Sequence, residues 1–465
     1  MSTISNAIEN AVVSGRRTVS SADAAATAAG LSAYAQGGNA FDAALAACFM
    51  ETICLPMKCG MAGDLVAIFR HQHGPWRSVV SVGPGPLALA DGAMLERVGP
   101  CSVGIPGAPA GYNFLASLSM LSLSELVSPA IRAADHGVYW NRIALSYLVE
   151  AQPLLERYSA RNPYMSGGRL PKIGEIRRLP GLGRLLERFA ESGAQLFWGK
   201  DGERLVRAVC DKGGFLKLDD LRVDPLNVLD CSVHQLAKGA TLRTTPPPTG
   251  GDRLASVLKH WQTGKEPLLE AVRQERGRAK ALGRQASQDG TSVVTAADEH
   301  GNAVVVVHSN SFPQFGSCVV LDDGLILNNR PGRGFDLEAP AGANNAPAAG
   351  KVPPTTLHAW VLEQDDRLLA GATPGGVNQI PWNSQTLSHL LAGSTIGEAV
   401  CLPKWALDEK GKLTAEDGCK VDAPDIEWRA SLSHRAAQQV FEIHGDGLVS
   451  AVADPRVGAR ALALY

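Results

Sequence analysis

A glycine and a threonine stand at the head of an apolar strand pattern, and this pair could do chemistry. Gly290 and Thr291 lead into the run TSVVTAA, and a turn-forming cluster at 298–302 separates this run from a second apolar run at 303–308. The pattern predicts a β-hairpin. The flexible glycine allows the threonine hydroxyl to attack the preceding carbonyl, and the freed α-amine, with a pKa of about 7.7–8.0, would then suit a base for that hydroxyl. An ordinary hairpin that begins with threonine is the alternative on local sequence alone.

Short motifs rich in glycine, proline and asparagine recur along the rest of the chain. In chain order they are GGNAFDAA (37–44), SVGIPG (102–107), PPPTGG (246–251), FGS (315–317), LILNN (325–329), TPGG (373–376) and ADPR (453–456). Together with the Gly290-Thr291 hairpin, their order resembles that of the γ-glutamyltranspeptidase family, from about residue 18 to the end of the chain. The combination is far more specific than any one motif.

This resemblance implies a layered α/β fold, the four-layer αββα sandwich of N-terminal-nucleophile hydrolases. It also implies self-cleavage between Gly290 and Thr291 into a large segment, 1–290, and a small segment, 291–465. Strands on both sides of the cut would share one core, so the two pieces are expected to remain together as a heterodimer within one domain. The polar, small residues 285–290 suit an exposed, cleavable linker.

The resemblance also assigns catalytic residues. Thr291 would be the nucleophile, and Ser309 and Asn310, at the end of the second strand of the hairpin, would hold the nucleophile and the substrate. Gly375 and Gly376 would form the oxyanion hole, because two glycines before a helix present backbone N–H groups with no side chain in the way. A plain turn at the start of a helix is the alternative for the glycines.

Substrate recognition departs from the glutamyl enzymes of the family. The stretch 82–87 lacks the arginine that grips the glutamyl carboxylate, and an arginine-containing segment follows Asn329 where those enzymes have an acidic pair. The pattern is closer to the branch that contains oxamate amidohydrolase and cephalosporin acylases. Arg330 or Arg333 could bind a substrate carboxylate in a bidentate manner, with a structural salt bridge as the alternative. Thr355 and Thr356 stand where the family has paired serines that line the pocket.

Composition fits a soluble enzyme rather than a nucleic-acid or membrane protein. The 465 residues carry a net charge of −2, and the basic cluster at 169–188 is interspersed with leucine and glycine, which indicates a solvated helix face. The first residues show no apolar signal segment, and the nine cysteines are scattered without a CxxC pair. We therefore expect a cytoplasmic protein without a membrane partner. We expect no cofactor and no metal, because no His/Cys/Asp cluster has ligand spacing, and His308 is expected to be a core or surface residue.

Hydrophobic periodicity predicts alternating helices and strands. Helices are expected at 21–35, 39–53 (with Asn39 as its N-cap), 109–120, 124–136, 182–193, 201–212, 267–280 and 395–399, with another after Gly376, and early strands at 65–69 and 78–82.

The sequence thus favours a self-processing threonine amidohydrolase or acyltransferase that acts on a small amide with a carboxylate. Two alternatives stay open. One is a true γ-glutamyl hydrolase or transpeptidase with a rebuilt pocket. The other is an unprocessed, non-catalytic relative that acts as a binding protein, since the segment before Thr291 is short for the family and Ser292-Val293 replaces its usual Thr-His pair.

Overall fold

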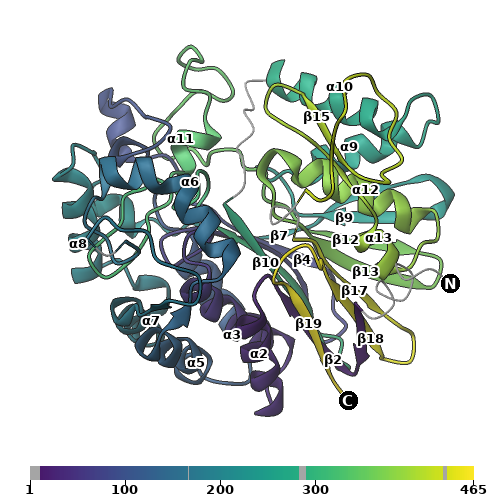
Figure 1. Ribbon diagram of the computed structural model, residues 1–465, viewed down its shortest axis with the longest axis horizontal. Helices are drawn as coiled ribbons and strands as arrows, with labels where there is room; N and C mark the ends of the chain where they lie inside the picture. Colours follow the sequence, from purple (N-terminus) through teal and green to yellow (C-terminus); the bar gives the residue numbers. More distant parts are fainter. Residues whose placement is uncertain (1–10, 166, 282–289, 433–436) are drawn as a thin grey trace.

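Two seven-stranded sheets lie at the centre of the molecule (Figure 1). The computed structural model describes residues 11–165, 167–281, 290–432 and 437–465. The sheet that carries Thr291, here called the Thr291 sheet, has the order β19 (Arg460–Leu464), β2 (Arg17–Ser21), β10 (Thr291–Ala297), β11 (Ala303–Ser309), β3 (Asp64–Arg70), β4 (Arg77–Ser81) and β7 (Leu226–Asp230). The other, here called the Trp360 sheet, has the order β1 (Val12–Gly15), β18 (Val449–Ala453), β17 (Gln439–Ile443), β13 (Arg367–Ala372), β12 (Trp360–Gln364), β9 (Thr241–Thr244) and β8 (Ser232–Gln235). Paired strands in both sheets run antiparallel.

Helices cover the outer sides of the sheet pair (Figure 1). On the side of the Thr291 sheet lie α2 (Ala24–Ala35), α3 (Ala40–Cys54), α4 (Ala108–Ala116), α5 (Leu123–His136) and α7 (Pro180–Ser192). On the side of the Trp360 sheet lie α9 (Gly251–Trp261), α10 (Leu268–Ala281), α12 (Gln379–Leu391) and α13 (Ile396–Cys401). Further elements are α6 (Arg142–Tyr158), α8 (Lys200–Cys210), α11 (Arg330–Gly334), the three-stranded sheet β14 (Trp405–Leu407), β15 (Leu413–Glu416) and β16 (Glu427–Arg429), and the pair β5 (Val138–Tyr139) and β6 (Ile176–Arg177). The predicted layered α/β fold is confirmed.

The hairpin β10–β11 is the most enclosed part of the Thr291 sheet. Every residue of both strands is buried. One face packs against α3 and the other against the Trp360 sheet, so both faces need apolar side chains and the valine run is nearly continuous. Polar contacts tie the two sheets together, because the Ser20 hydroxyl lies 2.7 Å from the Thr295 hydroxyl and donates to Gln439 Oε1 at 2.6 Å.

The predicted helix after Asn39 is confirmed, and its cap is visible. The Asn39 side chain accepts from the backbone N–H of Phe41 and Asp42, and Asp42 accepts from the Asn39 N–H in return, which completes a capping box. All 15 residues of α3 are buried, because the helix lies between the sheet and the outer helices. The preceding helix begins at Ala24 and not at Ser21, because Ser21 ends β2 and Asp23 supplies the N-cap.

Some local predictions were wrong or incomplete. Three helices, α6, α9 and the short α11, were not predicted. The basic cluster is not one solvated helix face, because Arg177 is 4% exposed and its Nη2 donates to the carbonyls of Ile53 and Cys54. The predicted linker at 285–290 falls, except for Gly290, outside the described residues. Among the helices that the structure describes, none is long and apolar enough to cross a membrane.

Candidate active site

Thr291, Ser309 and the carbonyl of Gly290 form one hydrogen-bonded group. Antiparallel pairing of β10 with β11 places Thr291 directly opposite Ser309, so both side chains point to the same face of the sheet. The Thr291 hydroxyl donates to Ser309 Oγ at 3.1 Å, and the Ser309 hydroxyl donates to the Gly290 carbonyl oxygen at 2.7 Å. The N–H of Ser311 holds Ser309 Oγ in place at 2.9 Å. The hydroxyl that would attack and the carbonyl that would be attacked therefore share one buried serine.

The same row of the sheet continues to a buried ion pair. Asp64, the first residue of β3, pairs directly with Ser309, so it faces the same way as Thr291 two strands away, a separation of about 10 Å. Its Oδ2 lies 2.6 Å from Nε of Arg330, and both side chains are at most 3% exposed. Burial raises the pKa of Asp64, while the Arg330 charge opposes that rise. The salt bridge that the sequence left as an alternative for Arg330 is thus present, and Asp64 is a partner that the sequence reasoning missed.

Arg330 still has hydrogen-bonding capacity. Its Nη2 is buried and has no hydrogen-bond partner among the described residues. The backbone N–H of Arg330 donates to Asn328 Oδ1 at 2.8 Å, which fixes the start of α11. The Nη2 of Arg330 is therefore a buried donor that no described residue satisfies.

Asn329 and Arg333 converge on one backbone carbonyl, that of Phe312. Nδ2 of Asn329 donates to it at 2.6 Å, and Nε of Arg333 donates to it at 2.9 Å. The Arg333 guanidinium also stacks on the Phe312 ring, 5.1 Å from its centroid. Burial lowers the pKa of Arg333, and the nearby Arg97 adds to this effect. Among the described residues, Arg333 forms no salt bridge, and the more distant carboxylate of Glu409 opposes part of the fall in its pKa.

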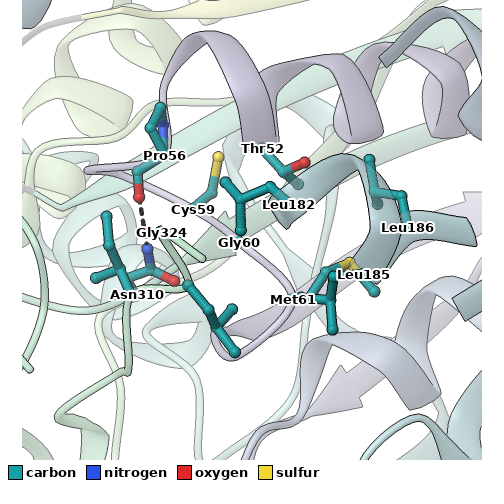
Figure 2. A pocket seen from close by; sticks show the side chains of 12 residues that line it. Thr52, Pro56, Cys59, Gly60, Met61, Leu182, Leu185, Leu186, Asn310 and Gly324 are labelled. Atoms are coloured by element: carbon teal, nitrogen blue, oxygen red, sulfur yellow. Dashed lines mark hydrogen bonds between the residues drawn. The ribbon is translucent and has the colours of Figure 1, made fainter. Parts of the chain in front are cut away.

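Asn310 points away from Thr291 and into a different part of the molecule. Its Nδ2 donates to the Pro56 carbonyl at 2.9 Å, as Figure 2 shows. Its Oδ1 is buried and has no hydrogen-bond partner among the described residues. The side chain lines a mainly apolar pocket with about 270 Å³ of open space, together with Cys59, Gly60, Leu182, Leu185 and Ile326 among others. The structure therefore separates Asn310 from Ser309, although the two are neighbours in sequence.

The Gly375-Gly376 segment forms a tight turn after β13. The φ angles are 127° at Gly375 and 51° at Gly376, in the left-handed region that favours glycine. A Cβ on Gly375 would also collide with the ring of Trp382. The turn leads into the short 3-10 helix η6 (Gly376–Asn378) and then into α12. The end of β13 is connected to β10, because Ala372 pairs with Gln439, which accepts a hydrogen bond from Ser20, and the Ser20 hydroxyl also contacts Thr295 of β10.

Thr356 shares a pocket with this turn. The pocket has about 280 Å³ of open space, and Thr356, Gly376, Arg253, Glu275 and Arg276 are among its lining residues. The Thr355 hydroxyl instead accepts from the N–H of Leu357 at 3.1 Å, so it shapes the loop. Of the residues predicted from sequence, the structure thus brings Thr291 to Ser309, Asn329 to Arg333, and Thr356 to Gly376.

Comparison with known proteins identifies the family. The family model described as Gamma-glutamyltranspeptidase matches residues 26–276 and 262–463. The chain belongs to the γ-glutamyltranspeptidase family. Its sequence is 30% identical over 253 residues to glutathione hydrolase 3 of Arabidopsis thaliana, and this match covers 52% of the chain but only 40% of that relative. It is 26% identical over 482 residues to the acylase ACY 1 proenzyme of Pseudomonas sp. (strain V22), which covers 84% of the chain and 82% of that proenzyme.

A solved structure shows the same fold. The cephalosporin acylase from Bacillus halodurans superposes with a TM-score of 0.84 at 23% identity, over 98% of this chain and 97% of that one. This agreement extends through both sheets and their helices.

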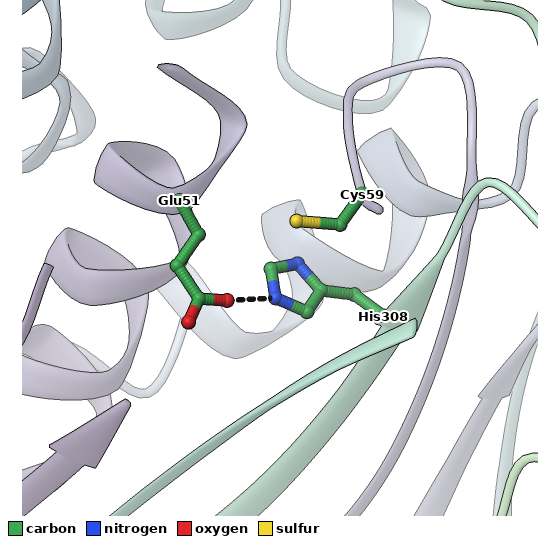
Figure 3. Close-up of side chains that lie close together, drawn as sticks. All are labelled: Glu51, Cys59 and His308. Atoms are coloured by element: carbon green, nitrogen blue, oxygen red, sulfur yellow. Dashed lines mark hydrogen bonds and ion pairs between the residues drawn. The ribbon is translucent and has the colours of Figure 1, made fainter. Parts of the chain in front are cut away.

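This γ-glutamyltranspeptidase-family chain has a further polar cluster between β11 and α3 (Figure 3). His308 is fully buried, with Nε2 2.6 Å from Glu51 Oε2 and Nδ1 2.6 Å from the Tyr112 hydroxyl. Cys59 lies close by, so three possible metal ligands come together where the sequence indicated no such cluster. Both ring nitrogens of His308 already have hydrogen-bond partners, so the arrangement is best described as a core network. It links β11 to α3 and α4.

Proposed function

We propose that this protein is a self-processing threonine amidohydrolase or acyltransferase that acts on a small substrate with a carboxylate. One observation carries the proposal: the Thr291 hydroxyl is 3.1 Å from Ser309 Oγ, which is 2.7 Å from the carbonyl oxygen of the preceding residue. A nucleophile and a polarised carbonyl in this relation are what intramolecular cleavage requires.

In the cleavage step, Thr291 Oγ attacks the carbonyl carbon of Gly290. The hydroxyl proton leaves through Ser309, and the C–N bond breaks as the Thr291 nitrogen takes up a proton. The product is an ester between Gly290 and the Thr291 side chain. The break of the C–N bond has already freed the α-amine of Thr291, and water then hydrolyses the ester, which releases the carboxylate of Gly290 and restores the Thr291 hydroxyl.

In turnover, the α-amine takes the proton from the Thr291 hydroxyl as this oxygen attacks the substrate amide. The N–H groups of the Gly375-Gly376 turn would stabilise the oxyanion. The amine part of the substrate leaves with a proton, and an acyl ester remains on Thr291. Water gives hydrolysis and an amine gives transfer, and both routes restore the free hydroxyl.

Two arginines support a carboxylate on the substrate. Arg330 is held by Asp64 in the row of Thr291 and Ser309 and retains a buried Nη2 without a described partner. Arg333 has no carboxylate partner among the described residues. Asn329, Thr355 and Thr356 would complete the pocket, and Asn310 would support its wall. The names of the acylase relatives agree with amide chemistry.

We also propose that the segments 1–290 and 291–465 stay together after cleavage and work in the cytoplasm. The cut would leave β2 and β11 on opposite sides of β10 in one sheet, although β2 belongs to the first segment. All nine cysteines are free thiols, which is typical of a reducing compartment.

Intact-mass measurement of the purified protein tests the processing. Two masses that correspond to 1–290 and 291–465 support the proposal. Activity is then compared on short amides with a free carboxylate and on γ-glutamyl-p-nitroanilide. Preference for the γ-glutamyl donor would instead identify a glutathione hydrolase type of enzyme. A single uncut mass without activity on any amide would identify a non-catalytic relative.

A further inference from the structure

Arg276 of α10 binds the segment that follows the Gly375-Gly376 turn. Its Nη2 donates to the Val377 carbonyl at 2.9 Å and to Asn378 Oδ1 at 3.3 Å. The same guanidinium donates to the carbonyls of Leu407 at 3.1 Å and Asp408 at 2.8 Å. One side chain from α10 therefore ties the turn to β14.

The turn is also braced from two other directions. The side chain of Asn378 accepts from the Leu407 N–H at 2.9 Å, and the Asn378 N–H closes the turn on the Gly375 carbonyl at 2.8 Å. Below the turn, the Trp382 ring packs against Gly375, and its Nε1 donates to the Trp405 carbonyl at 3.0 Å. Arg276 is the charged member of this frame, and it joins the frame to α10.

We propose that Arg276 is a positioning residue for the oxyanion-binding turn, an inference that rests on the proposed function. Two glycines with positive φ have little intrinsic preference for one conformation, so their N–H groups point correctly only if the surroundings fix them. Arg276 fixes the peptide that follows by holding the Val377 carbonyl and the Asn378 side chain. It acts through the turn and does not touch the substrate.

Arg276 stays charged although its surroundings disfavour the charge, and its hydrogen bonds orient it. Burial lowers its pKa to about 10, and the charge of Arg253 contributes, so the guanidinium remains protonated at neutral pH. Arg253 itself is paired with Glu275 at 2.6 Å, and both line the pocket beside Gly376. Because Glu275 already pairs with Arg253, the guanidinium of Arg276 donates to the three carbonyl oxygens and the Asn378 amide oxygen instead.

The inference separates cleavage from turnover. The Gly290 carbonyl receives its hydrogen bond from Ser309, so cleavage is not expected to depend on the glycine turn. Turnover of an added substrate would depend on it. An error of about 1 Å in a catalytic group can reduce a rate on the order of 100-fold.

The test compares Arg276→Ala with Arg273→Ala, a matched control on the same helix. Arg273 lies one turn earlier, and among the described residues it pairs with Glu270 alone, at 3.5 Å on the partly exposed surface. We expect Arg276→Ala to cleave at the wild-type rate, to bind substrate with unchanged KM, and to lose about 10- to 100-fold in kcat. Millimolar guanidinium chloride should restore part of the kcat of Arg276→Ala and leave Arg273→Ala unchanged. Arg276→Lys, which keeps the charge but not the fork, should give an intermediate kcat and serves if the alanine variant does not fold.

Three outcomes overturn the inference. One is a kcat for Arg276→Ala or Arg276→Lys equal to that of Arg273→Ala. Another is a loss that follows only the folded fraction and does not respond to guanidinium. If the wild type cleaves itself and hydrolyses a substrate while either of these two results is obtained, the proposed function stands and the role of Arg276 is refuted. A wild type that neither cleaves nor hydrolyses any amide refutes the proposed function, and the role of Arg276 falls with it.

Discussion

Replacing Ser309 by alanine should slow self-cleavage without unfolding the protein. Among the described residues, the Ser309 hydroxyl is the only side-chain donor to the Gly290 carbonyl oxygen, and the two oxygens lie 2.7 Å apart. During attack this oxygen becomes an oxyanion, and the hydrogen bond to it strengthens. Removing one donor of this kind costs about 100- to 1000-fold in rate, or about 2.7–4 kcal/mol of transition-state stabilisation.

The same substitution has a smaller effect on stability. It removes the acceptor of the Ser311 N–H and the donor to Gly290, so a loss of roughly 1–3 kcal/mol in the free energy of unfolding is expected. Ser309→Thr keeps the hydroxyl and should retain most of the cleavage rate. Ser292→Ala is the matched control, because Ser292 is equally buried on the neighbouring strand, faces the opposite side, and has an Oγ without a described partner.

The assay follows newly synthesised precursor over time by intact mass. The precursor of 465 residues should disappear as pieces of 290 and 465 − 290 = 175 residues appear. The expected order of rates is wild type and Ser292→Ala first, then Ser309→Thr, and Ser309→Ala far behind. Cleavage of Ser309→Ala at the wild-type rate would refute the role assigned to this hydroxyl. Equal slowing of Ser292→Ala would show that burial, and not the hydrogen bond, sets the rate.

Further predictions concern the nucleophile, the arginines and pH. Thr291→Ala should abolish both cleavage and turnover while Thr291→Ser retains part of each, and fragments from the alanine variant on a denaturing gel would disprove the assignment. If Arg333 binds the substrate carboxylate, Arg333→Ala should lower kcat/KM for carboxylate-bearing amides by an amount that corresponds to about 1.5–3 kcal/mol. Arg169 lies in an exposed pair with Glu175, so the control variant Arg169→Ala should leave kcat/KM unchanged. Equal kcat/KM in the two variants would show that Arg333 has a structural role only. Arg330→Ala should lower kcat/KM as well, but it also leaves Asp64 buried without its partner, so its melting temperature should fall where that of Arg333→Ala does not. His358 should make the folded protein sensitive to acid, because burial lowers its pKa from 6.5 to about 4. Its contribution to the free energy of unfolding is complete above pH 6.5, and up to roughly 3 kcal/mol of it is lost as the pH falls from 6.5 to 4. Urea unfolding of uncleaved Thr291→Ala at several pH values, with and without His358→Gln, checks this, and parallel pH profiles would contradict it.

The sequence predicted the elements that carry strong local signals. Asn39, the predicted N-cap, marks the start of α3, and the turn cluster at 298–302 marks the hairpin. The family motifs then predicted the layered fold, because their order reflects one arrangement of strands. The helices α6 and α9 were missed, since Pro153 lies inside the first and Gly251 begins the second, and both residues suggest interruptions when read locally.

Contacts between distant residues could not be predicted in the same way. Asp64 and Arg330 are 266 positions apart and meet only in the folded chain, so the sequence could offer a salt bridge of this arginine as an alternative but could not name its partner. His308 likewise gains Glu51, Tyr112 and Cys59 as neighbours from three separate segments. Sequence reasoning could name a basic or a polar residue but not the charge that it faces.

These contacts change how specificity is to be explained in this family member. A free arginine would bind a substrate carboxylate with its whole fork, but the Nε of Arg330 already donates to Asp64, and its buried Nη2 is the donor left without a described partner. The pair has no net charge, so its attraction for an anion is directional and short-ranged. Arg333 forms no salt bridge among the described residues, and it is stacked on Phe312 and donates to the Phe312 carbonyl. Selectivity would then arise from two arginines with different roles: Arg330 would set the direction of the carboxylate, and Arg333 would supply the positive charge. Substitution of Arg333 should therefore change mainly KM, and substitution of Arg330 mainly kcat.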